Sequence, residues 1–185
     1  MGEQTLAQST GPAGADAAAD VDHRLGDAEA WQQWLTGEAD RFNRYERPST
    51  VVSMILVGID ELTRWFGEEI VRDCVEGLLA AVVHGTRDSD LIALTAWGEV
   101  GVLMPETDEI EAINVINRID LAYERWQKEW PVARSVLLKG GGVRLACGWA
   151  NAGRSRSFSD AAAKAVERRV AAQRALESAA RPTAG

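Results

Sequence analysis

Arginine and aspartate side chains three residues apart form the first segment with binding chemistry. Arg87-Asp88-Ser89-Asp90 is followed, after five further residues, by Ala96. A guanidinium can hold a phosphate through two hydrogen bonds, and a carboxylate accepts bonds from N–H donors. The same residues also suit a junction between a helix and a strand, where Asp is common and Arg is favourable at the negative end of a helix dipole. The sequence leaves ligand binding and a purely structural role both open.

Histidine and cysteine offer other kinds of chemistry. His23 and His84 have no recognisable Ser or Cys nucleophile paired with them, so a hydrolytic triad is unsupported. Cys74 and Cys147 lie in apolar runs without metal-ligand neighbours at short spacing, which favours buried free thiols in a reducing compartment. We expect no metal and no cofactor, and a cytoplasmic location.

The apolar pattern predicts the first elements that would position Arg87. A helix begins near Asp27, which can cap it, and ends at Pro48, with Trp31, Phe42 and Tyr45 on its packed face. Residues 51–59 are almost all apolar, which predicts a central strand covered on both faces. Residues 66–82 repeat apolar positions at three-and-four spacing and predict a packed helix.

The second half of the chain predicts two hairpins and two helices. Residues 91–94 and 100–104 form the first hairpin, and 136–138 with 143–149 form the second, around a glycine turn at 140–142. Between them, a helix capped by Thr107 carries Ile110, Ile113 and further apolar residues on one face and ends at Pro131. A last helix covers about 159–179. Its arginines, Arg168, Arg169 and Arg174, are expected on a solvated face.

Trp126 and Trp130 could be part of the core or an exposed docking patch, because they lie four residues apart beside an apolar stripe.

The composition of the chain limits the classes of function that it can have. The 185 residues carry a formal charge of -8, which argues against a nucleic-acid partner, and no apolar stretch is long enough to span a membrane. We expect a disordered tail at 1–25, one domain at 26–178 and a flexible end at 179–185.

The order of elements, with its particular residues, resembles the GGDEF domain family over about residues 30–172. Arg44-Tyr45-Glu46-Arg47-Pro48 looks like the family's R-Y-x-R-P entry into the central strand. Residues 90–105 (DLIALTAWGEVGVLMP) align without a gap with its D-x-x-x-R-x-GGDEF-x-x-x-x-P hairpin, and 143–150 (VRLACGWA) resemble V-T-V-S-I-G-V-A. The resemblance implies an α/β (α+β) palm-like fold of the nucleotidyl-cyclase type, with a central mixed sheet flanked by helices.

Departures from the family pattern affect the metal ligands. In the family, an Asp at the end of the central strand and the acidic third letter of the signature hold two Mg²⁺ ions. Gly58 and Gly98 stand at these positions. Asp60 and Glu99 remain, but two carboxylates without their partners do not make a two-metal clamp, so a structural or solvated role is expected for them.

The nucleotide-binding positions have changed as well. The signature reads Ala96-Trp97-Gly98-Glu99-Val100, which puts an indole where the family's backbone lies against the nucleotide. The family's F-K after the strand is Leu62-Thr63, a guanine-binding Asp aligns with Arg72, and a late Lys aligns near Val170. The resemblance therefore implies a degenerate diguanylate cyclase that is not an enzyme.

One motif is retained. Many family members carry an R-x-x-D inhibitory site five residues ahead of the signature, where Arg and Asp hold the product, cyclic di-GMP, and Arg87 and Asp90 match it. An Arg can bind the N7 and O6 edge of guanine, and an Asp accepts from its N1 and N2 donors.

The resemblance thus predicts an inactive protein of cyclic di-GMP signalling that binds this ligand as a receptor or effector. The alternative is a nucleotide-independent scaffold that binds another signalling protein in trans, and dimerisation stays open. A rival from another class is an active nucleotidyl cyclase with relocated metal ligands, which metal-dependent GTP turnover would reveal.

Overall fold

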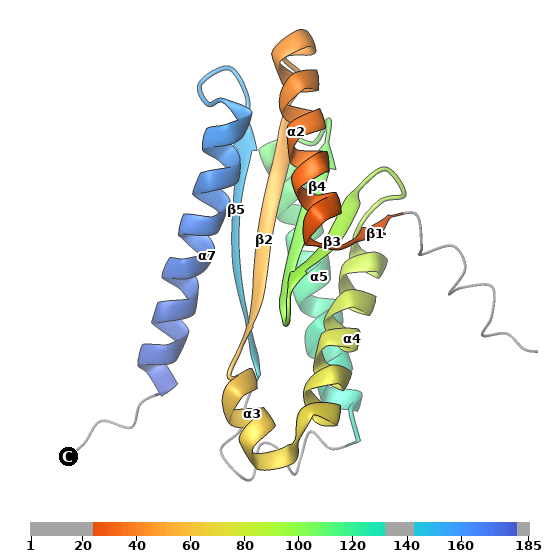
Figure 1. Ribbon diagram of the computed structural model, residues 1–185, viewed down its shortest axis with the longest axis vertical. Helices are drawn as coiled ribbons and strands as arrows, with labels where there is room; N and C mark the ends of the chain where they lie inside the picture. The colour runs from red at the N-terminus through yellow and green to blue at the C-terminus, as the bar shows by residue number, and fades with distance from the viewer. Residues whose placement is uncertain (1–23, 132–142, 181–185) are drawn as a thin grey trace, which may run out of the picture.

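A five-stranded mixed sheet carries helices on both of its faces (Figure 1). The computed structural model describes residues 24–131 and 143–180. The spatial strand order is β1-β3-β4-β2-β5. In chain order the elements are β1 (Leu25–Gly26), α2 (Ala28–Tyr45), β2 (Ser49–Val57), α3 (Ile59–Phe66), α4 (Glu68–Gly85), β3 (Leu91–Ala96), β4 (Glu99–Pro105), α5 (Glu109–Glu129), β5 (Arg144–Ala152) and α7 (Phe158–Ala180).

Strand β2 is central, as its apolar run predicts, and pairs antiparallel with both β4 and β5. Its bounds differ from the expected 51–59, because Gly58 adopts a left-handed backbone with φ 97° and ends the strand. Ile59 then opens α3, a short helix that the sequence reading missed. The hairpin of β3 and β4 is confirmed. The first strand and turn of the expected second hairpin, at 136–142, lie outside the described residues.

Each face of the sheet has its own core. The larger cluster joins β2, β3 and β4 to α3, α4 and α5, with Val52, Leu78 and Ile119 fully buried. The smaller cluster lies under α2 and α7 and is centred on Trp31 and Phe158. Trp31 packs directly on Gly101 of β4, where a Cβ would lie 2.8 Å from the indole. Tyr45, expected on the packed face of α2, is instead 63% exposed.

Helix α5 begins one residue later than predicted, because its N-cap is residue 108 and not residue 107. Asp108, and not Thr107, caps the helix, in a reciprocal pair with Glu111. Ile110 and Ile113, expected on the buried face, are exposed, and the buried residues are Ala112, Val115, Ile119 and Tyr123. Tyr123, Trp126 and Trp130 stack in series beside the larger core, so the two tryptophans belong to its rim and not to an exposed patch.

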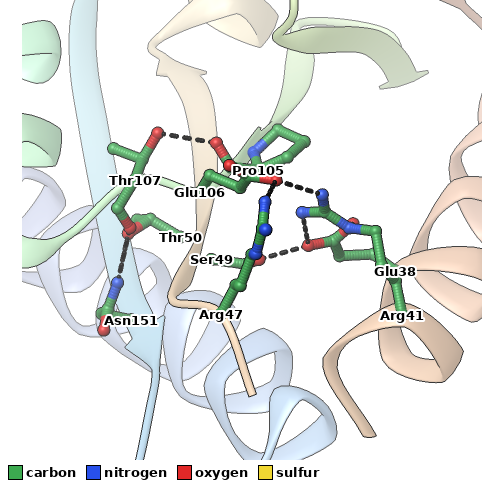
Figure 2. Close-up of polar contacts among 9 residues, drawn as sticks. All are labelled: Glu38, Arg41, Arg47, Ser49, Thr50, Pro105, Glu106, Thr107 and Asn151. Atoms are coloured by element: carbon green, nitrogen blue, oxygen red, sulfur yellow. Dashed lines mark hydrogen bonds and ion pairs between the residues drawn. The ribbon is translucent and has the colours of Figure 1, made fainter. Parts of the chain in front are cut away.

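A network of hydrogen bonds and ion pairs joins α2, the start of β2, the end of β4 and β5 at one end of the sheet (Figure 2). Glu38 is buried and accepts hydrogen bonds from Ser49 and Arg41, and the carboxylate of Glu106 binds both Arg41 (3.1 Å) and Arg47 (2.7 Å). Nearby, Asn151 of β5 donates to Thr50 and to the Thr107 carbonyl, at 2.8 Å each. The Arg47 of the R-Y-x-R-P-like segment therefore joins the entry of β2 to the exit of β4.

Candidate functional site

The turn that connects α4 to β3 brings Arg87 and Asp90 together. The Asp90 N–H donates to the Arg87 carbonyl at 3.0 Å, and the Arg87 N–H donates to Asp90 Oδ2 at 2.8 Å. Asp90 thus binds the backbone of its own turn, as aspartate often does. The Arg87 side chain stays 49% exposed. The two residues therefore differ in access: the arginine is open to a ligand, and the carboxylate closes the turn.

Asp90 is an ionisable group inside the protein, with 1% of its surface exposed. Burial raises the pKa of this carboxyl, whereas the Arg87 N–H and the positive charges of Arg87, Arg24 and Arg118 act in the opposite direction. Its Oδ1 is buried and has no hydrogen-bond partner in the part of the chain that the structure describes. A buried carboxylate with a spare acceptor is costly unless nearby cations balance it.

Two further arginines reach this turn from distant elements. Arg118 of α5 is exposed and donates through Nη2 to the Gly85 carbonyl at 2.8 Å, two residues before Arg87. Arg24, only 7% exposed, donates to the Arg87 carbonyl at 2.7 Å. Sequence reasoning missed both. Arg118 lies among polar residues of a predicted helix, and no local signal shows that this helix packs beside the turn.

The exposed guanidinium of Arg87 already has an acidic neighbour. Glu111 Oε1, in the first turn of α5, lies 3.3 Å from Arg87 Nη2, and the two side chains are about equally exposed, at 45% and 49%. Exposed ion pairs of this kind contribute little free energy, about 0.2 to 1 kcal/mol. Glu111 can therefore give way to an anionic ligand at small cost.

The signature positions lie at the opposite end of β3. The Leu56 N–H donates to the Gly98 carbonyl at 2.9 Å, and Gly98 has φ 75°. A Cβ at Gly98 would lie 3.0 Å from Ile59 Cδ1 on a left-handed backbone, so an Asp there would be strained. Gly58 brings no side chain at all. Asp60 is exposed in the first turn of α3.

Glu99 is the acidic residue that remains in the signature-like segment 96–100, and its carboxylate forms an ion pair with an arginine. Arg169 Nη1 of α7 lies 3.2 Å from Glu99 Oε1, with the arginine side chain 11% exposed. The expectation that Arg169 lies on a solvated face is therefore wrong, because α7 turns this residue toward the hairpin; Arg168 and Arg174 are exposed as expected. Within residues 24–131 and 143–180, no group of three or more His, Cys, Asp or Glu could hold a metal ion. The two-Mg²⁺ site of the family does not fit these residues.

The same end exposes aromatic surface. Trp97, at the hairpin tip, is 52% exposed, and Trp65 of α3 is 59% exposed.

The two cysteines are free thiols, as expected. Cys74 is buried, which raises its pKa to about 12, and Cys147 is partly buried. No helix in the described ranges is long and apolar enough to cross a membrane.

No protein-family model and no curated protein matches this sequence, but solved structures match its fold. The GGDEF domain of FimX from Pseudomonas aeruginosa aligns with a TM-score of 0.68 at 14% identity, covering 82% of this chain and 90% of that one. The GGDEF domain of DgcB from Caulobacter crescentus, solved with cyclic di-GMP, gives 0.69 at 12% identity, covering 82% and 86%. The diguanylate cyclase SiaD from Pseudomonas aeruginosa, solved with its activator SiaC, gives 0.68 at 16%, covering 86% of this chain and 61% of SiaD. At these identities the likeness concerns the fold.

Proposed function

Because this chain has the fold of a GGDEF domain, we propose that it is a non-catalytic protein of cyclic di-GMP signalling that binds this nucleotide at the Arg87 turn. One observation carries the proposal: the exposed guanidinium groups of Arg87 and Arg118 come from different elements to the same turn, which the buried Asp90 closes. The complex of the DgcB domain with cyclic di-GMP shows that this fold accommodates the ligand in another protein.

The chemistry of the ligand suits the two arginines. Cyclic di-GMP presents two phosphates and two guanine bases, and a guanidinium binds either a phosphate or the O6 and N7 edge of guanine in a bidentate manner. Asp90 Oδ1 is the acceptor that would meet the guanine N–H groups. It is buried in this conformation, so that contact requires the side chain to move, whereas Arg87 and Arg118 are exposed.

The other half of the proposal is the lack of catalysis. Phosphoryl transfer of the GGDEF type depends on two metal ions between carboxylates. Gly58 and Gly98 bring none, and the Glu99 carboxylate is ion-paired with Arg169. The Glu99–Arg169 ion pair, which the sequence did not predict, thus supports the inference that this protein is not a cyclase.

Titration calorimetry with cyclic di-GMP tests the binding. Arg87→Ala and Arg118→Ala each remove charge-assisted hydrogen bonds worth about 1.5 to 3 kcal/mol, so each should weaken the affinity roughly 10- to 150-fold. Arg125→Ala is the matched control, because it removes an exposed arginine from the same helix and should leave the affinity nearly unchanged. Full affinity in folded Arg87→Ala and Arg118→Ala proteins would refute the site.

Incubation with GTP and Mg²⁺ tests the second half. We expect no cyclic di-GMP to form, and its appearance at a rate proportional to protein concentration would restore the rival interpretation of an active cyclase.

A second candidate function is a scaffold that binds another signalling protein without nucleotide. The exposed Trp97 and Trp65 favour it, since tryptophan is enriched among the residues that dominate protein interfaces. SiaD, solved with its activator SiaC, is a protein of this fold with a protein partner. Calorimetric silence toward both cyclic di-GMP and GTP would favour the scaffold, and Trp97→Ser should then weaken the partner complex.

A further inference from the structure

Arg24 is attached to both sides of the ligand turn. Its Nη1 donates to the Arg87 carbonyl at 2.7 Å and lies 3.8 Å from Asp88 Oδ1, and its own carbonyl accepts the Ile92 N–H at 2.8 Å. The Arg24 side chain is 8% exposed, so its bond to the Arg87 carbonyl is largely buried, whereas Asp88 is fully exposed and its long ion pair with Arg24 contributes little. Arg24 thus connects the residue that begins the turn with the strand that follows it.

The Arg87 carbonyl is the point at which the bonds of the turn converge. It accepts from Arg24 Nη1 and from the Asp90 N–H. The positive charge of Arg24 also acts on the buried Asp90 carboxyl and favours its ionised form. Loss of the guanidinium would therefore remove one of two donors from the carbonyl and one of the cations that balance Asp90, and both changes would loosen the turn.

Arg24 directly precedes β1, a two-residue strand at the edge of the described sheet. Within the described residues, β1 pairs with β3 at two positions, Leu25↔Ile92 and Gly26↔Ala93. Gly26 lies tightly against Trp34, where a Cβ would be 2.5 Å from the ring. Such a short parallel pairing contributes little by itself. The Arg24 side chain adds a direct link from the start of β1 to the Arg87 carbonyl.

We propose that Arg24 is a positioning residue that holds the Arg87 turn in its binding conformation, and that it couples ligand binding to the docking of β1. This inference rests on the proposed function, because it concerns the same ligand turn. Arg24 itself does not touch the ligand. Linkage makes the coupling reciprocal: a bound ligand stabilises docked β1, and any partner that detaches β1 weakens ligand binding.

The first test compares cyclic di-GMP affinities by calorimetry. Arg24→Gln should weaken binding about tenfold, and Arg24→Lys, which keeps the charge, should recover part of the loss. Arg72→Gln is the control, since Arg72 is an exposed arginine of α4 away from the turn and should bind as the wild type does. Unchanged affinity in a folded Arg24→Gln protein would overturn the coupling.

The second test needs no ligand and separates the two proposals. Amide hydrogen exchange at Asp90 and Ile92 should be faster in Arg24→Gln than in Arg72→Gln, because the turn and the β1 contact have both loosened. Equal exchange in the two variants would refute the positioning role. If the wild type does not bind cyclic di-GMP, the proposed function fails, and the exchange rates still decide whether Arg24 holds the turn.

Discussion

Asp90 combines deep burial, an oxygen without a hydrogen-bond partner among the described residues, and a surrounding set of arginines. Its folded-state pKa is raised by burial, so the proton binds more tightly in the folded chain than in the unfolded one. The stabilisation from that proton is present at low pH and is lost as the pH rises through the raised pKa. We therefore expect the wild type to become more stable relative to Asp90→Asn as the pH falls from 7 toward 4.

Urea denaturation at several pH values measures this difference. Asp88→Asn is the matched control, because it removes a fully exposed carboxylate from the same turn. A stability difference between wild type and Asp90→Asn that does not change with pH would contradict the assignment of a raised pKa to Asp90.

Glu111 is ion-paired with Arg87, so we expect it to compete with the proposed ligand for this guanidinium. Glu111→Gln keeps the acceptor of the helix cap but removes the charge of the 3.3 Å ion pair. We expect cyclic di-GMP to bind about two- to fivefold more tightly, the range that a surface pair allows. Glu109→Gln, in the same first turn, controls for the general loss of negative charge, and an equal gain in both variants would show that the pair itself has no effect.

At the level of elements, the sequence predicts those parts of the fold that local periodicity determines. The central strand, the β3–β4 hairpin and the helices from Ala28, Glu109 and Phe158 follow from apolar spacing, although Asp108 and not the expected Thr107 caps the helix from Glu109. Helix α3 was missed because Gly58 interrupts an apolar run that reads as one strand. The two residues of β1 are too few to give a pattern, and only their pairing with β3 defines them.

The same limit applies to the site. Arg87 and Asp90 could be found because they lie in one short motif. Arg24 and Arg118 are 63 and 33 residues away from their acceptors, and Arg169 is 70 residues from Glu99. Such pairings depend on how helices and strands pack, which spacing in a single sequence does not contain. Arg169 was accordingly misplaced on a solvated face.

The close approach of α7 to β5 is the packing feature most sensitive to one methyl group. A Cβ at Gly148 would lie 2.1 Å from the Arg169 nitrogen and 2.2 Å from the Ala165 carbonyl oxygen. Because these are backbone atoms, Gly148→Ala must displace the helix, and we expect a loss of about 1 to 3 kcal/mol or more in urea denaturation.

Gly37→Ala is the control, because it should raise the free energy of unfolding where Gly148→Ala lowers it. Gly37 lies inside α2 with no atom within 4 Å of an added Cβ, so the substitution should stabilise the protein by about 0.5 to 1 kcal/mol. A Gly148→Ala protein as stable as the wild type would show that α7 is not held so closely.

At the scale of the whole molecule, the proposed ligand-binding turn and the altered signature lie at opposite ends of β3. The Arg87 turn precedes Leu91 and the altered signature begins at Ala96, and a strand of six residues is roughly 20 Å long. The formal charge of -8 disfavours an anionic ligand over most of the surface, so binding at the turn would depend on the charges of the exposed Arg87 and Arg118. Binding at the turn should therefore weaken as ionic strength rises.

The most direct test of the account is an amide chemical-shift map recorded while cyclic di-GMP is added. We predict that the largest changes occur at residues 86–90 and around Arg118, with Arg24 and Leu25 following, while Gly58 and residues 97–99 stay unchanged. Changes centred on Gly58 and the Trp97–Glu99 hairpin would place a nucleotide at the signature end, and no changes at all would leave this protein without the ligand proposed for it.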